Sequence, residues 1–430
     1  MGRFLADTRP LAIPAYRRVF LGQGTAVVGM MITAVTVPVQ LYDLTRSSLV
    51  VGLSGLVGLL PVVVFGLYGG AIADAVDRRK LALVASSVSW VITLALLTQS
   101  LADVRSPVLI LGLVAVQSGS FAVSASARGA ILPLLVPADL VPAANALSYT
   151  ASTLGQVLGP LLAGLLVQLP NGFSYAYAAD AVLFTASLHA AARLPSFGVA
   201  DALGKPGLRS IVEGLRFLGG NPVLMTSFAV DIAAMVLATP EALFPQAAAT
   251  RFDGGVGPLY SAIAIGSILA GLVSGWIGGV RRQGVALTVA VVIWSAAIAV
   301  AGFAHSLWAV VGLLVVAGAA DFVSAVYRQA ILQTYVPDRL RGRLQGVFTV
   351  VVNGGPRLGD LRAGFMAAAT TFTLAWSGAA VLCIAVVLVA AVCVRPFWRY
   401  DAQAVHAPAV VGDPSPDVLS QPARRPAPSS

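Results

Sequence analysis

Apolar runs long enough to cross a bilayer alternate with short polar breaks along almost the whole chain. The first six runs lie near residues 19–41, 50–72, 81–101, 108–132, 140–168 and 174–192, and six more lie near 223–248, 257–279, 285–304, 307–332, 344–369 and 371–394. A membrane-spanning helix needs about 20 predominantly apolar residues, and the runs meet that length. The first run is also too long for a signal peptide. The pattern therefore predicts an all-α integral membrane protein with twelve transmembrane helices.

The composition excludes a water-soluble protein. Of the 430 residues, 58% are hydrophobic and 10% are charged, whereas a soluble domain carries about 25% charged residues. That excludes a soluble enzyme and also a nucleic-acid-binding protein, despite the net charge of +9. Two cysteines and three scattered histidines are too few for a disulfide framework or a zinc site. We therefore expect no metal and no cofactor.

The basic residues predict the orientation in the membrane. If the N-terminus is cytoplasmic, 22 of the 27 Lys and Arg residues lie in cytoplasmic segments, and Arg328 is counted among them. Only Arg46, Arg105 and Arg251 then lie outside. Because basic loops stay in the cytoplasm, we predict a multi-pass protein of the inner (plasma) membrane with both termini cytoplasmic.

Five segments follow from the spans and the loops between them. We predict a cytoplasmic N-terminus (1–18), a six-helix bundle (19–193), a cytoplasmic linker with an amphipathic helix (194–222), a second six-helix bundle (223–394) and a disordered cytoplasmic tail (395–430).

The two halves of the chain repeat each other at an offset of 200 residues. Arg128-Gly-Ala-Ile-Leu aligns with Arg328-Gln-Ala-Ile-Leu, and the glycines of the fifth span recur in the eleventh. Six spans per repeat make the two repeats parallel, and parallel repeats place a substrate cavity near the midplane, between two bundles that rock against each other. The repeat therefore predicts a secondary active transporter that works by alternating access.

A glycine, an acid and a basic pair lie between the second and third spans. Gly70 would let a neighbouring helix approach, and Asp74 would accept a hydrogen bond from a facing helix or from Arg78, beside Arg79. We interpret this loop as a conformational latch, with a plain loop of solvated charges as the alternative.

The fifth span carries small residues four apart, which form a flat stripe for tight helix packing. The stripe consists of Gly155, Gly159, Pro160 and Gly164. Its twin in the eleventh span keeps the glycines and adds two basic residues and one acid, Arg357, Arg362 and Asp360. Packing alone is the alternative to a functional role for the stripe.

Acids inside spans are costly and mark cavities or charge partners. The candidates for proton coupling are Asp231, Asp321, Asp360 and Glu241, with Arg357 and Arg362 as intramembrane partners; Asp180 also lies inside a span. Structural pairing with an arginine is the alternative for Asp321 and Asp360. Asp231 ranks first, because no basic residue near it in the sequence would neutralise it.

Neutral polar residues are the candidates for the substrate cavity, and a neutral lining suits a bulky, weakly charged ligand. They are Gln23, Thr36, Tyr149, Gln156 and Gln329.

These motifs resemble the major facilitator superfamily from about residue 10 to 400. Gly70, Asp74, Arg78 and Arg79 match its loop signature, although Ala75 replaces a basic residue and Asp77 a glycine, and the fifth-span stripe is similar to the antiporter motif of proton-coupled exporters. The segments 51–54, 69–74 and 332–343 are similar to the enterobactin-exporter branch, which is related to macrolide-type efflux proteins.

The resemblance implies a monomeric major facilitator fold in the bilayer and the export of a small amphipathic molecule, a siderophore or a hydrophobic drug, driven by protons. The alternatives are an importer or a lipid flippase of the same fold. A membrane-embedded enzyme is disfavoured because no nucleophile–base set is visible, and no phosphate-binding loop for ATP is found.

Overall fold

The computed structural model describes residues 7–75, 78–193, 216–336 and 338–398. This part of the chain is helical and contains twelve helices of 15 residues or more. Eight of the described helical segments are long and apolar enough to cross a membrane. The all-α membrane fold predicted from the apolar runs is therefore confirmed.

The first half contains six long helices, and each coincides with a predicted run. They are α1 (Pro14–Thr45), α2 (Ser48–Ala75), α3 (Arg78–Leu101), α4 (Pro107–Leu135), α5 (Val141–Leu166) and α6 (Gly172–Ala192). Short 3₁₀ turns, η1 (Arg9–Ala12) and η2 (Ala138–Leu140), precede α1 and α5. Most of these helices extend beyond the apolar run by a few residues, because backbone hydrogen bonding continues where the side chains become polar.

The second half has six more spans, of which three are interrupted. The seventh predicted run is divided into α8 (Pro222–Ala238), η3 (Glu241–Leu243) and α9 (Phe244–Thr250), and the eighth into α10 (Val256–Leu272) and η4 (Ser274–Gly279). Then follow α11 (Gln283–Ala301), α12 (Leu307–Tyr335), α13 (Asp338–Ala369), a π-helical turn η5 (Leu374–Gly378), α14 (Ala379–Cys393) and α15 (Arg395–Trp398). Pro240 and Pro245 explain the break after α8, since proline cannot donate the backbone hydrogen bond that continues a helix.

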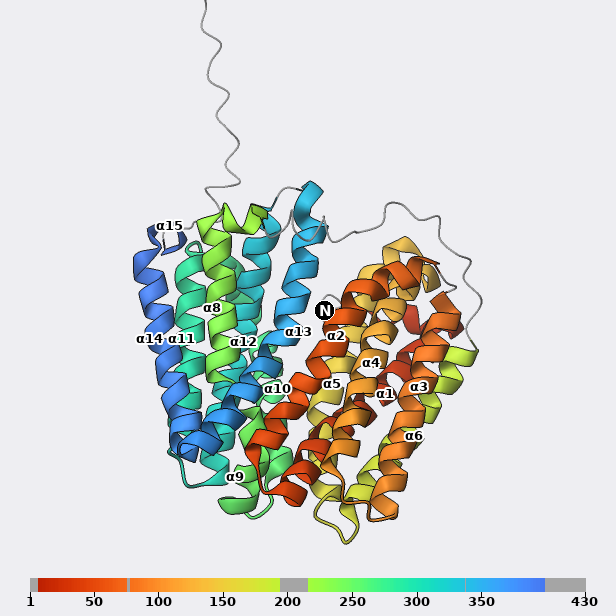
Figure 1. Ribbon diagram of the computed structural model, residues 1–430. Coiled ribbons are helices and arrows are strands. Elements are labelled where there is room, and N and C mark those ends of the chain that lie inside the picture. The colour runs from red at the N-terminus through yellow and green to blue at the C-terminus, as the bar shows by residue number, and fades with distance from the viewer. Residues whose placement is uncertain (1–6, 76–77, 194–215, 337, 399–430) are drawn as a thin grey trace, which may run out of the picture.

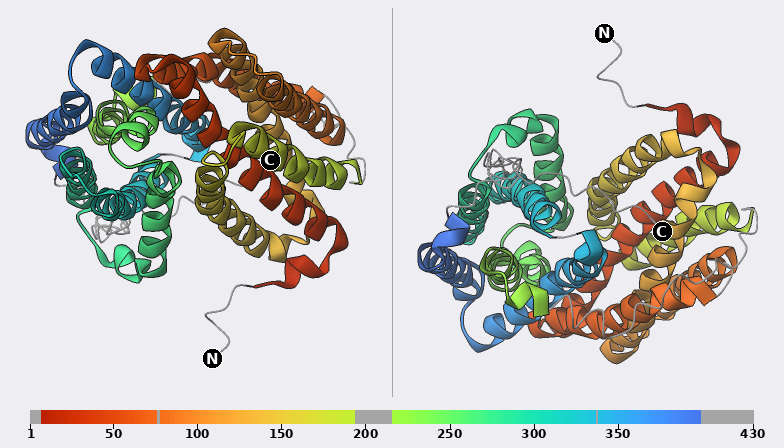
Figure 2. Two further views of the ribbon diagram at one scale, coloured as in Figure 1. Left: turned by 90° about the horizontal axis from the view of Figure 1, so that it is seen from below. Right: turned by 90° about the horizontal axis from the view of Figure 1, so that it is seen from above.

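The helices pack as two bundles (Figures 1 and 2). Helices α1 to α6 contact one another, as do α8 and α10 to α14, and the bundles meet through α2 against α13 and α5 against α10. We call the side at which α1 and α8 begin and α2 and α6 end the linker side, which is at the top of Figure 1. The other side is called the far side.

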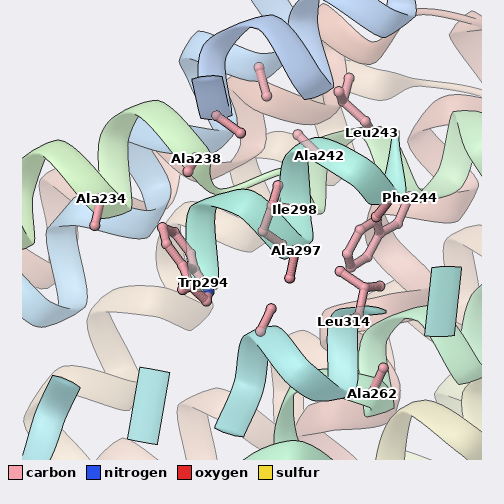
Figure 3. Close-up of a cluster of buried hydrophobic side chains, with 14 of the residues drawn as sticks. Ala234, Ala238, Ala242, Leu243, Phe244, Ala262, Trp294, Ala297, Ile298 and Leu314 are labelled. Carbon is pink, nitrogen blue, oxygen red and sulfur yellow. The ribbon is translucent and has the colours of Figure 1, made fainter. Parts of the chain in front are cut away.

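A hydrophobic core fills the second bundle. Figure 3 shows Phe244 of α9 close to Leu314 of α12, and Trp294 and Ile298 of α11 lie nearby. Phe244, Leu314 and Ile298 are fully buried. Alanines such as Ala234 and Ala262 bring the backbones close together. This packing holds α8, α9, α10, α11 and α12 together in the second bundle.

The predicted linker helix and tail lie mostly outside the described residues, as does the N-terminus up to residue 6. Those predictions stay predictions.

Candidate functional site: a bundle interface, buried charges and a polar cavity

The two glycine-rich helices pack in the same way in the two halves. Gly159 of α5 lies against α1, where a Cβ atom would be 2.9 Å from the carbonyl oxygen of Val28. Gly355 of α13 lies against α8, where a Cβ atom would be 2.9 Å from the Cβ of Met235. Because α8 is the counterpart of α1, the repeat in the sequence corresponds to a repeated packing relation.

The last glycine of each stripe faces the other bundle. A Cβ atom on Gly164 would lie 2.6 Å from the Cα of Gly257 on α10, and one on Gly364 would lie 3.1 Å from the Cα of Leu49 on α2. Side chains at these positions would force the bundles apart. Both contacts lie near the far-side ends of their helices, so the glycines permit the bundles to close there.

Hydrogen bonds also join the bundles on the far side and near the middle. Ser48 donates to the Oε1 of Gln246 over 2.7 Å, and Ser261 donates to the carbonyl of Val157 over 3.0 Å. The Gln168 amide donates to the carbonyl of Gly254 over 3.4 Å. These contacts and the glycine contacts close the molecule between its middle and its far side.

A buried arginine connects two of the predicted acids. Arg328 of α12 forms an ion pair with Asp231 of α8, and its Nη2 lies 3.7 Å from the Oδ1 of Asp321. The Asp231 side chain is 1% exposed and Arg328 is 6% exposed, whereas Asp321 is 44% exposed. One guanidinium therefore serves a buried acid and an accessible one.

The position of Arg328 corrects the sequence-based count of Lys and Arg residues in cytoplasmic segments. Arg328 does not belong to a cytoplasmic loop but lies inside α12 as the counter-ion of Asp231. Sequence reasoning missed this role. The signal was present, because Arg328 follows Asp321 by seven residues, two helical turns, and so lies on the same face of α12.

The acids near the helix break have local partners. Asp360 of α13 accepts a hydrogen bond from the backbone N–H of Ala242 over 3.0 Å and so caps η3. Glu241 is close enough to Asp360 for their charges to repel, and its carbonyl accepts from the Tyr260 hydroxyl over 3.1 Å. Asp360 therefore stabilises the interrupted span.

The two arginines of α13 turn to different partners. Arg362 donates to three backbone carbonyls, those of Val236 and Thr239 at the end of α8 and Ala375 in η5, over 3.0, 2.9 and 2.7 Å. Arg357 reaches the hydroxyl of Ser118 on α4 in the other bundle over 3.4 Å. Arg362 thus satisfies carbonyls that the helix break after α8 leaves without helical partners, and it connects this break to η5.

A cavity of about 550 Å³ opens within the first bundle, between polar and apolar side chains. Five helices line it (α1, α3, α4, α5 and α6), through Gln23, Ala26, Val27, Met30, Ser89, Gln117, Phe121, Asn145, Ser148, Tyr149, Ser152, Asp180 and Phe184. Two of the predicted cavity residues, Gln23 and Tyr149, lie there. Asp180 is 1% exposed, and its Oδ2 accepts from the hydroxyls of Thr33 and Thr93 over 2.6 and 3.2 Å.

The other predicted cavity residues lie elsewhere. Thr36 is fully buried and donates to the carbonyl of Ile32 in its own helix. Gln156 is exposed on α5 and Gln329 is half-buried on α12; neither lines the cavity of the first bundle.

The predicted latch lies largely outside the described side chains. Of Gly70, Asp74 and Arg78 only the helical backbone is described, at the end of α2 and the start of α3. Arg79 donates to the carbonyl of Ala192 over 2.6 Å, so it connects the start of α3 to the end of α6. Among the described residues, no cluster of three or more His, Cys, Asp or Glu side chains could hold a metal ion.

The sequence similarity to known relatives extends over most of this chain. The enterobactin exporter EntS of Shigella boydii serotype 4 (strain Sb227) is 28% identical over 364 residues, which are 83% of this chain and 86% of that protein. The enterobactin exporter EntS of Citrobacter koseri (strain ATCC BAA-895 / CDC 4225-83 / SGSC4696) is 27% identical over 363 residues, with the same coverage.

Solved transporters share the fold. The chain resembles the nucleoside transporter NupG with a TM-score of 0.70 and 14% identity, over 90% of this chain and 99% of that one. It resembles a bacterial homologue of the iron transporter ferroportin in an inward-facing state with a TM-score of 0.66 and 14% identity, over 90% and 99% of the chains. At these identities the likeness concerns the fold.

The family model described as transmembrane secretion effector matches residues 6–417, nearly the whole chain. Together with the helical repeat and the transporter fold, this match confirms the resemblance inferred from the motifs and sets the chain among membrane transporters rather than enzymes. The protein belongs to the transmembrane secretion effector family of the major facilitator superfamily.

Proposed function

We propose that this protein exports a small amphipathic molecule from the cell by alternating access, driven by protons. The observation that carries the proposal is the set of contacts that closes the two bundles between the middle and the far side. Gly164 against Gly257 and Ser48 against Gln246 hold the far side together, and a cavity lies in the first bundle. A transporter that opens its two sides in turn needs such a separable set of contacts.

The charge arrangement in the second bundle supports proton coupling. Arg328 lies between Asp231 and Asp321, and Asp321 is the more exposed acid. A proton from water would reach Asp321 first and weaken its attraction to Arg328. Asp231 then holds the Arg328 guanidinium until Asp231 itself accepts the proton. The release of Arg328 at that point changes the packing of α8 against α12. In this proposal Asp321 is the entry point and Asp231 the buried proton carrier.

The relatives supply the direction and the first choice of cargo. Both relatives named above are enterobactin exporters, so a siderophore is our first candidate for the exported molecule and a hydrophobic drug our second. The cavity lining combines neutral polar side chains with aromatic and other apolar ones, which is compatible with an amphipathic molecule.

We further propose that both termini are cytoplasmic and that the protein works as a monomer. Cysteines introduced at Asp103, in the loop between α3 and α4, and at Gln283, at the start of α11, lie on the far side and the linker side. An impermeant thiol reagent applied to whole cells should label only the first, after Cys383 and Cys393 have been replaced. Labelling of the cysteine at Gln283 alone would show that the orientation is the opposite one.

Transport in everted membrane vesicles tests the main proposal. An acid interior should drive the uptake of radiolabelled enterobactin, and a proton-conducting uncoupler should abolish it. The Asp321→Asn variant should keep exchange of the cargo across the membrane but lose the response to the pH gradient. Uptake by whole cells instead of by everted vesicles would indicate an importer, and movement of labelled phospholipid alone a flippase.

A deletion strain tests the cargo. When it is grown without iron, it should retain a catechol-type chelator that the parent strain secretes. An unchanged secretion profile, with the retention of lipophilic compounds, would favour the hydrophobic-drug alternative.

A further inference from the structure

The cavity of the first bundle has an unbalanced charge. Of the described side chains that line it, Asp180 is the one acid, and none is a Lys, Arg or His. The nearby polar residues, Gln23, Gln117 and Asn145, are neutral amides. A ligand in this cavity therefore meets the field of one carboxylate that the lining does not neutralise.

The partners of Asp180 leave its charge intact. Thr33 and Thr93 both donate to its Oδ2, and hydroxyl donors stabilise a carboxylate without cancelling its charge. Its Oδ1 is buried and has no hydrogen-bond partner among the described residues. The acids of the second bundle differ, because Arg328 balances Asp231 there.

The walls of the cavity suit a ligand with an apolar body. Phe121, Phe184 and Tyr149 contribute rings from three helices, and Met30 adds a flexible apolar side chain. Aromatic faces attract cations as well as apolar groups. The volume of about 550 Å³ lies within the range of drug-sized binding sites.

We propose that this cavity binds the cationic end of a lipophilic ligand, with Asp180 as its counter-ion. Charges interact more strongly inside a protein than in water, so the carboxylate attracts a cation even through the neutral lining and repels an anion. The choice of cargo rests on the proposed transport function, and this inference favours a cationic hydrophobic drug over a catechol siderophore.

Two probes of nearly equal shape and opposite charge test the proposal. Equilibrium dialysis of the purified protein in lipid nanodiscs would measure the binding of radiolabelled tetraphenylphosphonium and tetraphenylborate, without a pH gradient. We expect the phosphonium to bind at least tenfold more tightly than the borate. Asp180→Asn should weaken phosphonium binding at least tenfold, which corresponds to about 1.4 kcal/mol.

Matched variants separate charge from folding. Asp103→Asn removes an equal charge from an exposed loop and should leave both affinities unchanged. Gln23→Lys adds a positive charge to the cavity wall without altering the bonds of Thr33 and Thr93 to Asp180, and it should reverse the preference. Equal affinity for the two probes in the wild type, or unchanged phosphonium binding in both Asp180→Asn and Gln23→Lys, would overturn the proposal.

The binding assay is independent of transport. Selective phosphonium binding without proton-driven export would refute the proposed function and keep this inference. Proton-driven export of enterobactin, with equal affinity for the two probes, would support the proposed function and refute this inference.

Discussion

The two bundles hold their buried acids in different ways. In the first bundle, Asp180 accepts hydrogen bonds from two threonines and keeps an unbalanced charge beside a cavity. In the second, Asp231 is paired with Arg328, which also reaches Asp321. The two bundles thus hold charge differently, in keeping with the proposals that the first bundle recognises the cargo and the second responds to protons.

The largest expected effect comes from breaking the ion pair of the second bundle. Asp231→Asn leaves Arg328 buried without its carboxylate, and loss of one partner of a buried pair costs about 3–5 kcal/mol. The double variant Asp231→Asn/Arg328→Gln removes both charges and should regain most of the stability without regaining proton-driven transport. Thermal unfolding in one detergent, with vesicle transport, measures both. A single variant as stable as the wild type would show that the pair is not formed.

The next effect concerns the two arginines of α13. Arg362→Gln removes a guanidinium that donates to three carbonyls and should lower the free energy of unfolding by about 3 kcal/mol. Arg357→Gln is the matched control, since Arg357 makes one long bond to Ser118, and it should cost about 1 kcal/mol. Equal losses in the two variants would contradict the assignment of Arg362 to the helix break.

Closure between the bundles gives a third test. Gly164→Ala places a methyl group against the backbone of Gly257 and should reduce transport about tenfold, or about 1.4 kcal/mol, because the far side no longer closes. Gly112→Ala is the control, as nothing lies within 4 Å of a Cβ there.

A disulfide reports this closure directly. In a background without Cys383 and Cys393, Ser48→Cys/Gln246→Cys should cross-link across the interface. The yield should fall with Gly164→Ala and stay the same with Gly112→Ala. A yield that does not respond to Gly164→Ala would remove the glycine from this role.

The smallest effect on stability is expected in the first bundle. Asp180→Asn keeps an oxygen that can accept from Thr33 and Thr93, so the free energy of unfolding should fall by only about 1 kcal/mol, the difference between charged and neutral acceptors. Thermal unfolding of the Asp180→Asn and Asp231→Asn variants in the same detergent measures the difference between the two losses of stability. Equal destabilisation by the two substitutions would mean that Asp180 also depends on a counter-ion.

Local patterns predicted the helices well and the partners of charged residues poorly. The stripe from Gly155 to Gly164 predicted close packing, and the structure places Gly159 against α1 and Gly164 against α10. Asp231 was ranked first because no basic residue lies near it in the sequence, yet Arg328 reaches it from α12, 97 residues later. Arg357 and Asp360, three residues apart, attract each other as charges, but their hydrogen bonds go to Ser118 and Ala242.

The sequence by itself determined that the chain is a membrane protein of twelve helices and a transporter of the major facilitator type. These features follow from the local balance of apolar and charged residues and from the repeat, both of which are readable along the chain. Only the tertiary structure decided that Arg328 balances Asp231, that Arg362 caps the broken span and that Asp180 lies beside a cavity with no counter-ion among the described residues. The reason is physical: charges inside a membrane protein are satisfied by neighbours in space, and those neighbours come from helices far apart in the sequence.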